Sequence, residues 1–483
     1  MTPRSAATLS AAVLLLGLMS CSGAKSKPKH LPPIIFVPGY GMGALQVEVE
    51  RQGRPAAKFD FLLPAMNPDA VFAELRPPAA NALDYARQRG LDAADVGFVR
   101  DWLKLDIDAK GSAQNRPGVH VRPVSIGENF SHECPRYSGM VDILASVGWE
   151  PNRNLDCIPF DYRYPPGETN FAEDLKNLIV SRVEQTNGTK VTLACHSQGC
   201  LLAYHFLRTA DPVWVAEHIG LFFSLAGQFS GCSDCLRWAF QKQWNWDSEN
   251  KVVSPSDMTW VGELALGLQR SVYGEEVLYR WGQRSYRAID VVSLLREAGA
   301  LEIARATDRY ALDQQTWFQK GARDHEPLPV PTRVVFGTDL PTTAGFSFSR
   351  EQASDPNCKT PQCGGLYSQD DPELIQTSGD QGDSRWMNQA PRVWLKDPQC
   401  EMKEFAFVGH MDIFENIEVL SYLTETVRQI ASGNDPCAEV LTLKGSPKKS
   451  SRAPANDYLL KVMVASHPGE NDGEYGHRRL WTS

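Results

Sequence analysis

The sequence lacks an apolar run of the roughly 20 residues that a helix needs to span a bilayer, which argues against an integral membrane protein. It also lacks a block of Lys and Arg outside its C-terminal tail. Its 483 residues include 49 Lys or Arg and 58 Asp or Glu, a formal net charge of −9, so nucleic-acid binding is not expected. No internal repeat is visible. Because 42% of the residues are hydrophobic, the chain can bury a sizeable core, and a wholly disordered protein is excluded.

The first residues predict export. Arg4 precedes a mostly apolar stretch, and small residues follow it up to Ala24. This pattern is typical of a secretory signal peptide over residues 1–24, with cleavage after Ala24. The segment Leu18–Cys21 loosely resembles a bacterial lipobox, so an envelope lipoprotein is the alternative. We therefore expect a secreted protein or one of the secretory or lysosomal pathway.

No cysteine falls between residues 22 and 133, and ten of the eleven cysteines lie after that gap. An even set in an exported chain favours disulfides. Two close pairs occur, Cys232 with Cys235 and Cys358 with Cys363, but they lie too far apart for the usual zinc spacing. No metal site is expected.

Apolar runs and 3.6-residue periodicity predict strands that alternate with helices. We expect strands over 34–37, 119–124, 154–160, 190–195, 221–226, 334–336 and 405–408, and helices over 138–147, 171–185, 199–209 and 416–430. This order predicts the α/β class, with a mostly parallel central sheet and helices on both faces.

The domain boundaries follow from changes in composition. We expect one α/β domain over 31–432, with a lid-like insertion at about 46–118 and a helical cap insertion at about 229–330. The second insertion contains six tryptophans, which are either exposed or buried in a core of its own. A tail rich in Lys, Ser, Pro and Gly, residues 438–483, is expected to be disordered.

Ser197 is the candidate nucleophile. An apolar strand over 191–195 runs directly into a helical segment, and Ser197 lies at the turn between them. That context predicts a nucleophile elbow, a strained turn that projects the serine hydroxyl above the sheet edge. Gly199 fits the crowded backbone of such a turn, whereas Cys195 replaces the usual first glycine. His196 precedes the serine, so its side chain is expected to point away and to be structural.

Acyl transfer also needs two backbone N–H groups that point at the oxyanion. One is expected from Gln198, which follows the nucleophile, and the other from Tyr40 in the glycine-rich loop after the first strand. A dinucleotide site competes, because Gly39, Gly41 and Ala44 fit G-x-G-x-x-A, with Asp60 farther along. The charged stretch after this loop gives no strand–helix–strand unit, which disfavours a cofactor.

His410 is the candidate base, because it directly follows a predicted strand late in the chain. A nucleophile elbow between a strand and a helix predicts the α/β-hydrolase fold, in which the chain order of the triad is serine, acid, histidine. Two acids remain open, Asp383 in a polar turn and Asp339 directly after a strand, and position after a strand by itself slightly favours Asp339.

Taken together, these residues resemble the lecithin:cholesterol acyltransferase family, which includes lysosomal phospholipase and the phospholipid:diacylglycerol acyltransferases. The similarity covers roughly residues 31–430, with landmarks at Ile34–Gly41, 118–123, Gly148-Trp149, Pro159–Arg163, Cys195–Leu201, Ser224–Gly227, Gly337–Thr342, Gly382-Asp383 and His410. The resemblance implies that the acid lies in the Gly-Asp turn, so Asp383 is preferred to Asp339, with Asp380 third. The family's lid disulfide has no counterpart here, so 59–66 or 98–105 would form a lid.

The expected function is therefore a serine-dependent O-acyltransferase or phospholipase with Ser197, Asp383 and His410 as triad. It would cleave a fatty-acyl ester of a phospholipid and pass the acyl group to an alcohol, such as a sterol, or to water. The expected place of action is a peripheral membrane or lipoprotein surface, and no cofactor is expected. A non-catalytic lipid-binding surface protein and a soluble carboxylesterase are the alternatives.

Overall fold

The computed structural model describes residues 31–62, 102–229, 259–264, 273–297, 301–317, 328–348, 373–382 and 399–433, with the single residues 384, 391, 392, 395 and 397. The predicted signal peptide and tail lie outside the described residues, as do the pairs Cys232–Cys235 and Cys358–Cys363. Within these ranges, no helix has the length and apolar character needed to cross a membrane.

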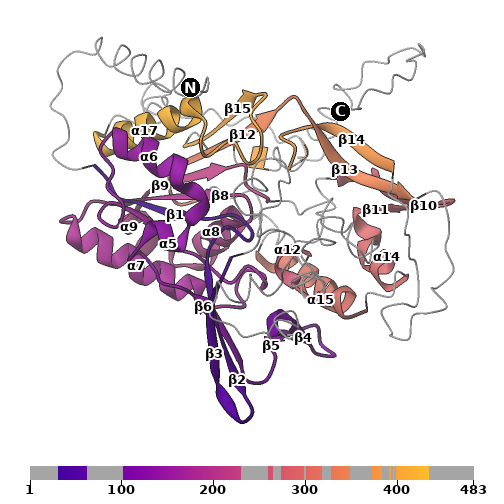
Figure 1. Cartoon of the computed structure of the whole chain (residues 1–483). Helices are drawn as coiled ribbons and strands as arrows, with labels where there is room; N and C mark the ends of the chain where they lie inside the picture. The colour runs from indigo at the N-terminus through magenta and orange to yellow at the C-terminus, as the bar shows by residue number, and fades with distance from the viewer. Residues whose placement is uncertain are drawn as a thin grey trace, which may run out of the picture. The chain divides into compact units, whose positions relative to one another are not determined.

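A six-stranded sheet forms the core of the fold (Figure 1), and all its neighbouring strands are parallel. Its order is β15 (Cys400–Ala406), β12 (Thr332–Thr338), β9 (Ile219–Leu225), β8 (Val191–His196), β1 (Ile34–Val37) and β7 (Leu155–Cys157). The chain runs from β1 out to β7 and then returns to the other side of β1 with β8. Ligands of such sheets bind where the order reverses, at the carboxyl ends of the strands. The predicted α/β-hydrolase fold with a mostly parallel central sheet is confirmed.

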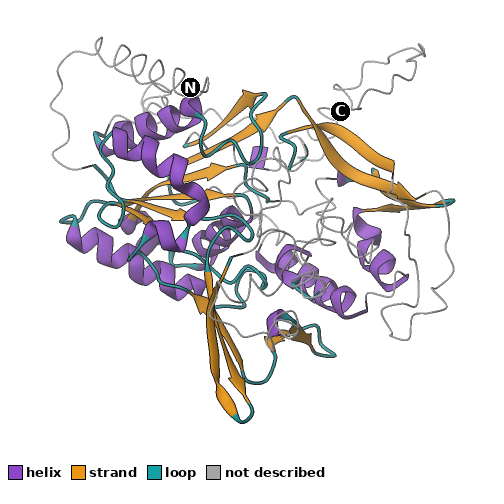
Figure 2. Ribbon diagram, in the orientation of Figure 1, coloured by secondary structure: helices purple, strands orange, loops and turns teal. Residues whose placement is uncertain are grey.

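Helices cover both faces of this sheet (Figure 2) because successive strand residues point to opposite sides. Ile35 and Val37 of β1 join one apolar cluster, and Ile34 and Phe36 join the other. The first cluster includes residues of α7 (Phe171–Gln185), α8 (Gln198–Thr209) and α9 (Pro212–His218). The second includes residues of α5 (Phe130–Glu133), η1 (Pro135–Tyr137), α6 (Ser138–Ser146) and α17 (Ile417–Ala431). The strands are therefore apolar on both sides, as parallel strands usually are.

Most of the described part of the first insertion consists of strands and the turns between them. A three-stranded antiparallel sheet joins β2 (Leu45–Arg51) to β3 (Arg54–Phe61) and β6 (Val119–Pro123), and β4 (Leu105–Ile107) pairs with β5 (Ala113–Asn115). This hairpin follows the loop after β1, where a dinucleotide site would need a helix, and the Asp60 carboxylate lies 2.9 Å from His132 Nε2. The local fold therefore contradicts the dinucleotide alternative.

The second insertion was predicted to be helical, but its described part contains both helices and strands. Its described elements are α12 (Val261–Leu264), β10 (Val277–Trp281), β11 (Arg284–Arg287), η4 (Ala288–Asp290), α14 (Val291–Glu297) and α15 (Leu301–Trp317). A four-stranded sheet joins β11 and β10 to β13 (Leu340–Phe348) and β14 (Glu373–Gly379). Trp260 and Trp281 are buried, so of the two alternatives for the tryptophans, exposure is wrong at these positions. Trp238, Trp244 and Trp246 lie outside the described residues.

A buried ion pair joins the edge strand β7 to α7. Both carboxylate oxygens of Asp156 accept hydrogen bonds from Arg182, from Nε at 2.6 Å and from Nη2 at 2.7 Å. Arg182 Nη2 also donates to the carbonyl oxygen of Gly127 at 2.8 Å. Asp156 is fully buried, so the loss of one partner would leave a charge without compensation.

We therefore expect Asp156→Ala to lower the free energy of unfolding by about 3–5 kcal/mol, measured by chemical denaturation. The control is Glu150→Ala, which removes the exposed pair between Glu150 and Arg153 and should cost less than about 1 kcal/mol. Equal losses in the two variants would show that burial does not set the cost of this pair.

Candidate active site

Ser197 lies at a strained turn between β8 and α8, with φ 54° and ψ −129°. The rest of the fold holds this left-handed backbone in place. The Ser197 amide donates to the carbonyl oxygen of Leu225 at the end of β9, at 3.0 Å, and the Gln228 amide donates back to the Ser197 carbonyl at 3.3 Å. A side chain at Gly199 would collide with the carbonyl oxygen of Pro38. The geometry is that of the predicted nucleophile elbow.

A disulfide spans the elbow. Cys195, which replaces the usual glycine two residues before the nucleophile, is bonded to Cys200 in the first turn of α8. A second disulfide joins Cys134 to Cys157 at the end of β7. The expectation of structural disulfides is confirmed, and the unusual residue at position 195 acquires a physical explanation.

His410 lies between Ser197 and a buried carboxylate. Its Nε2 is 3.0 Å from Ser197 Oγ, and its Nδ1 is 3.3 Å from Asp380 Oδ2. Because the carboxylate is an acceptor, Nδ1 carries the proton and Nε2 is left to accept the proton of the serine. The three side chains are almost entirely buried, with 5% of Ser197, 9% of His410 and none of Asp380 exposed. This arrangement can perform nucleophilic catalysis.

The turn after β14 fixes both partners. The His410 amide donates to the carbonyl oxygen of Asp380 at 2.6 Å, and the Gly382 amide donates to Asp380 Oδ1 at 3.0 Å. Gly382 packs so closely on the imidazole that a Cβ there would lie 2.5 Å from His410 Cγ. The aspartate and the histidine ring therefore hold each other in one orientation.

The structure describes two of the three acids considered from the sequence, Asp339 and Asp380. Asp383 lies outside the described residues, so its assignment stays a prediction. Asp339 is exposed and its carboxylate accepts a hydrogen bond from Thr338 Oγ1 at 3.0 Å. The carboxylate at His410 is that of Asp380, the third candidate. One signal was available in the sequence, because Gly379-Asp380 is also a Gly-Asp pair.

The two predicted oxyanion donors belong to segments that pack together. Gly39, the neighbour of Tyr40, lies so close to the elbow that a Cβ there would be 3.1 Å from Ser197 Cβ. Gln198 is the first residue of α8, where the amides of a helix N-terminus favour negative charge. The amides of Tyr40 and Gln198 therefore remain our proposal for the oxyanion hole.

His196 is structural, as expected from its position before the serine. Its Nδ1 lies 2.9 Å from Tyr137 Oη, and its Nε2 lies 3.0 Å from the carbonyl oxygen of His410. Burial lowers the pKa of His196 well below its ordinary value, and the neighbouring His410 lowers it further. His196 is therefore neutral, and both of its ring nitrogens make hydrogen bonds to groups other than Ser197.

Residues 97–240 match the family model for lecithin:cholesterol acyltransferase. The predicted resemblance to this family is confirmed. The matched range includes Ser197 and the disulfide Cys134–Cys157, but Tyr40, Asp380 and His410 lie beyond it.

Three curated proteins are similar to this chain at low identity. Lecithin-cholesterol acyltransferase-like 1 of Arabidopsis thaliana is 26% identical, over 41% of this chain and 49% of its own. Phosphatidylcholine-sterol acyltransferase of Gallus gallus is 30% identical, over 26% and 32% of the two chains. Lysosomal phospholipase A and acyltransferase of Bos taurus is 29% identical, over 25% and 32%. The chain thus spans about half the length of the first relative and a third of the other two.

Replacement of the acid distinguishes the candidates. We expect Asp380→Asn to lower kcat on an ester substrate by about 10³- to 10⁴-fold, because His410 would lose the acceptor that fixes its tautomer. Asp339→Asn, at an exposed aspartate, serves as the matched control and should change kcat by less than about threefold, while Asp383→Asn tests the competing assignment. A large loss in Asp383→Asn together with a nearly unchanged Asp380→Asn would contradict the assignment.

Proposed function

We propose that this protein is a serine-dependent acyltransferase or phospholipase that cleaves a fatty-acyl ester of a phospholipid. The observation that carries the proposal is the hydrogen-bonded series from Ser197 through His410 to Asp380 at a nucleophile elbow. A non-catalytic lipid-binding protein would have no need of this alignment or of a strained serine backbone.

The first half of the reaction forms an acyl-enzyme. Ser197 Oγ attacks the ester carbonyl carbon while its proton moves to His410 Nε2. The carbonyl oxygen becomes an oxyanion, which the amides of Tyr40 and Gln198 would stabilise. When the tetrahedral intermediate collapses, the ester C–O bond breaks, and His410 gives its proton to the departing lysophospholipid oxygen. The Asp380 carboxylate stabilises the imidazolium of His410.

The second half transfers the acyl group. An acceptor hydroxyl, from an alcohol or from water, gives its proton to His410 and attacks the acyl-enzyme. Ser197 then leaves with that proton returned to its oxygen. The fate of the acyl group depends on which hydroxyl reaches His410: an alcohol such as a sterol gives a new ester, and water gives a fatty acid.

The choice of lipids rests on the relatives. One is named for transfer from phosphatidylcholine to sterol, and another for phospholipase A and acyltransferase activity. We infer that this chain acts on a phospholipid at a membrane or lipoprotein surface. Disulfides form and persist mainly in oxidising compartments, so Cys134–Cys157 and Cys195–Cys200 support the predicted export of the protein.

The test uses phosphatidylcholine liposomes with and without sterol or diacylglycerol. We expect fatty acid from liposomes alone and an ester of the added alcohol when one is present, both lost in Ser197→Ala. Activity on short water-soluble esters without activity on liposomes would replace the proposal with a soluble carboxylesterase. A folded protein that releases no acyl group from either substrate would contradict any catalytic function.

A further inference from the structure

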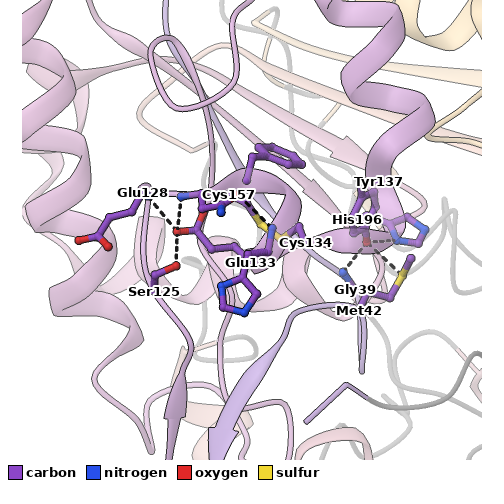
Figure 3. The surroundings of a disulfide bond; sticks show 12 residues. Gly39, Met42, Ser125, Glu128, Glu133, Cys134, Tyr137, Cys157 and His196 are labelled. Carbon is purple, nitrogen blue, oxygen red and sulfur yellow. Dashed lines mark hydrogen bonds between the residues drawn. A yellow bond between two sulfur atoms is a disulfide. The ribbon is translucent and has the colours of Figure 1, made fainter. Parts of the chain in front are cut away.

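A buried tyrosine hydroxyl lies between the glycine-rich loop and the histidine that precedes the nucleophile (Figure 3). Tyr137 ends the short helix η1 and is fully buried. Its Oη lies 2.8 Å from the amide nitrogen of Gly39 and 2.9 Å from His196 Nδ1. His196 Nε2 continues the series to the carbonyl oxygen of His410 at 3.0 Å. Four segments that are remote in the sequence thus meet in one line of hydrogen bonds.

The chemistry of the four groups fixes the direction of every bond. The His410 carbonyl can only accept, so His196 carries its proton on Nε2, and its Nδ1 is then an acceptor. The Tyr137 hydroxyl must donate to Nδ1, which leaves the Tyr137 oxygen to accept from the Gly39 amide. All the donors therefore point from the loop toward the catalytic histidine.

Two further observations bear on the direction of these bonds. Met42 Sδ lies 3.0 Å from Tyr137 Oη and is a second possible acceptor for the hydroxyl proton, but a thioether accepts more weakly than an imidazole nitrogen. Burial raises the pKa of Tyr137 and lowers that of His196, so both groups stay neutral. His196 therefore remains an acceptor at Nδ1 even when its neighbour His410 becomes an imidazolium during the reaction.

We propose that Tyr137 and His196 are positioning residues that set the distance between the oxyanion loop and the catalytic histidine. The inference rests on the proposed function, because Tyr137 and His196 are proposed to act by positioning the Tyr40 amide and His410. Gly39 is the residue that the Tyr137 hydroxyl holds, and the next amide along the chain, that of Tyr40, is the proposed oxyanion donor. A displacement of about 1 Å in such a donor is enough to cost much of its effect on the transition state.

The test compares Tyr137→Phe with Tyr286→Phe. Both remove a hydroxyl that makes hydrogen bonds, but the Tyr286 hydroxyl donates to Glu297 in the second insertion, at 2.8 Å. With p-nitrophenyl butyrate, we expect Tyr137→Phe to lower kcat by about 10- to 100-fold, less than the roughly 10²- to 10³-fold loss of a direct oxyanion donor. KM should stay within about twofold, and Tyr286→Phe should match the wild type.

A boronic acid separates positioning from a purely structural effect. It adds to Ser197 Oγ as a tetrahedral mimic of the transition state, so its Ki in Tyr137→Phe should rise by the factor by which kcat/KM falls. Unchanged kcat and Ki in a folded Tyr137→Phe would overturn the proposal. A rise in KM alone would also overturn it, because the hydroxyl would then act on substrate binding.

A measurement on the wild type covers the case in which Tyr137→Phe does not fold. Nitrogen NMR of ¹⁵N-histidine-labelled protein should find His196 neutral at pH 5.5 with its proton on Nε2. A protonated His196, or a proton on Nδ1, would contradict the directed series. Failure of the proposed serine catalysis would look different, since the wild type would then hydrolyse the ester no faster than Ser197→Ala, and failure of the phospholipid specificity would appear only with liposomes.

Discussion

The left-handed backbone of Ser197 is the constraint on which the rest of the site depends. A non-glycine residue in this conformation costs of the order of 1–3 kcal/mol, so it persists only where its surroundings determine it. Here β8 is held between β1 and β9, the Ser197 amide donates to the end of β9, and the Cys195–Cys200 disulfide closes the turn. The contacts with the sheet and the disulfide together offset the free-energy cost of the strained backbone at Ser197.

The partners of the serine follow the ends of two strands from different sheets. His410 follows β15, and Asp380 follows β14, a strand of the second sheet. The end of β12 lies against both of these segments. A Cβ at Gly337 would collide with the carbonyl oxygen of Val408 and lie 3.0 Å from Asp380 Cβ. The close approach of three backbones, rather than any single contact, places the acid at the histidine.

Most of the core could be predicted from local pattern. The strand at 34–37 and the helix at 171–185 agree with β1 and α7, because each has an uninterrupted apolar run or a clear helical period. Ser197 and His410 could also be predicted, since each follows a short apolar run in the sequence, residues 191–195 and 405–408. Where a segment buries its apolar residues in the core, the spacing of those residues in the sequence predicts whether it is a strand or a helix.

The pattern was misleading where strands are polar or half exposed. The hairpin of β2 and β3 alternates buried and exposed residues, but its exposed face is charged, and the sequence pattern predicts only a lid-like insertion there. The strand β15 was placed too late, at 405–408, because most of its residues are not fully buried. The strand β14 was missed for the same reason, and with it the clue that Asp380 ends a strand. Its pairing with β13 is a long-range contact that no local window contains.

The central claim is that Ser197 becomes covalently acylated during turnover. The most direct measurement is mass spectrometry of peptides from the enzyme after an acid quench in the presence of phosphatidylcholine. The account predicts that the peptide containing Ser197 gains the mass of a fatty-acyl group, and that this gain disappears with Ser197→Ala. An acyl group on another residue, or turnover with no acylated peptide under conditions that trap known acyl-enzymes, would contradict it.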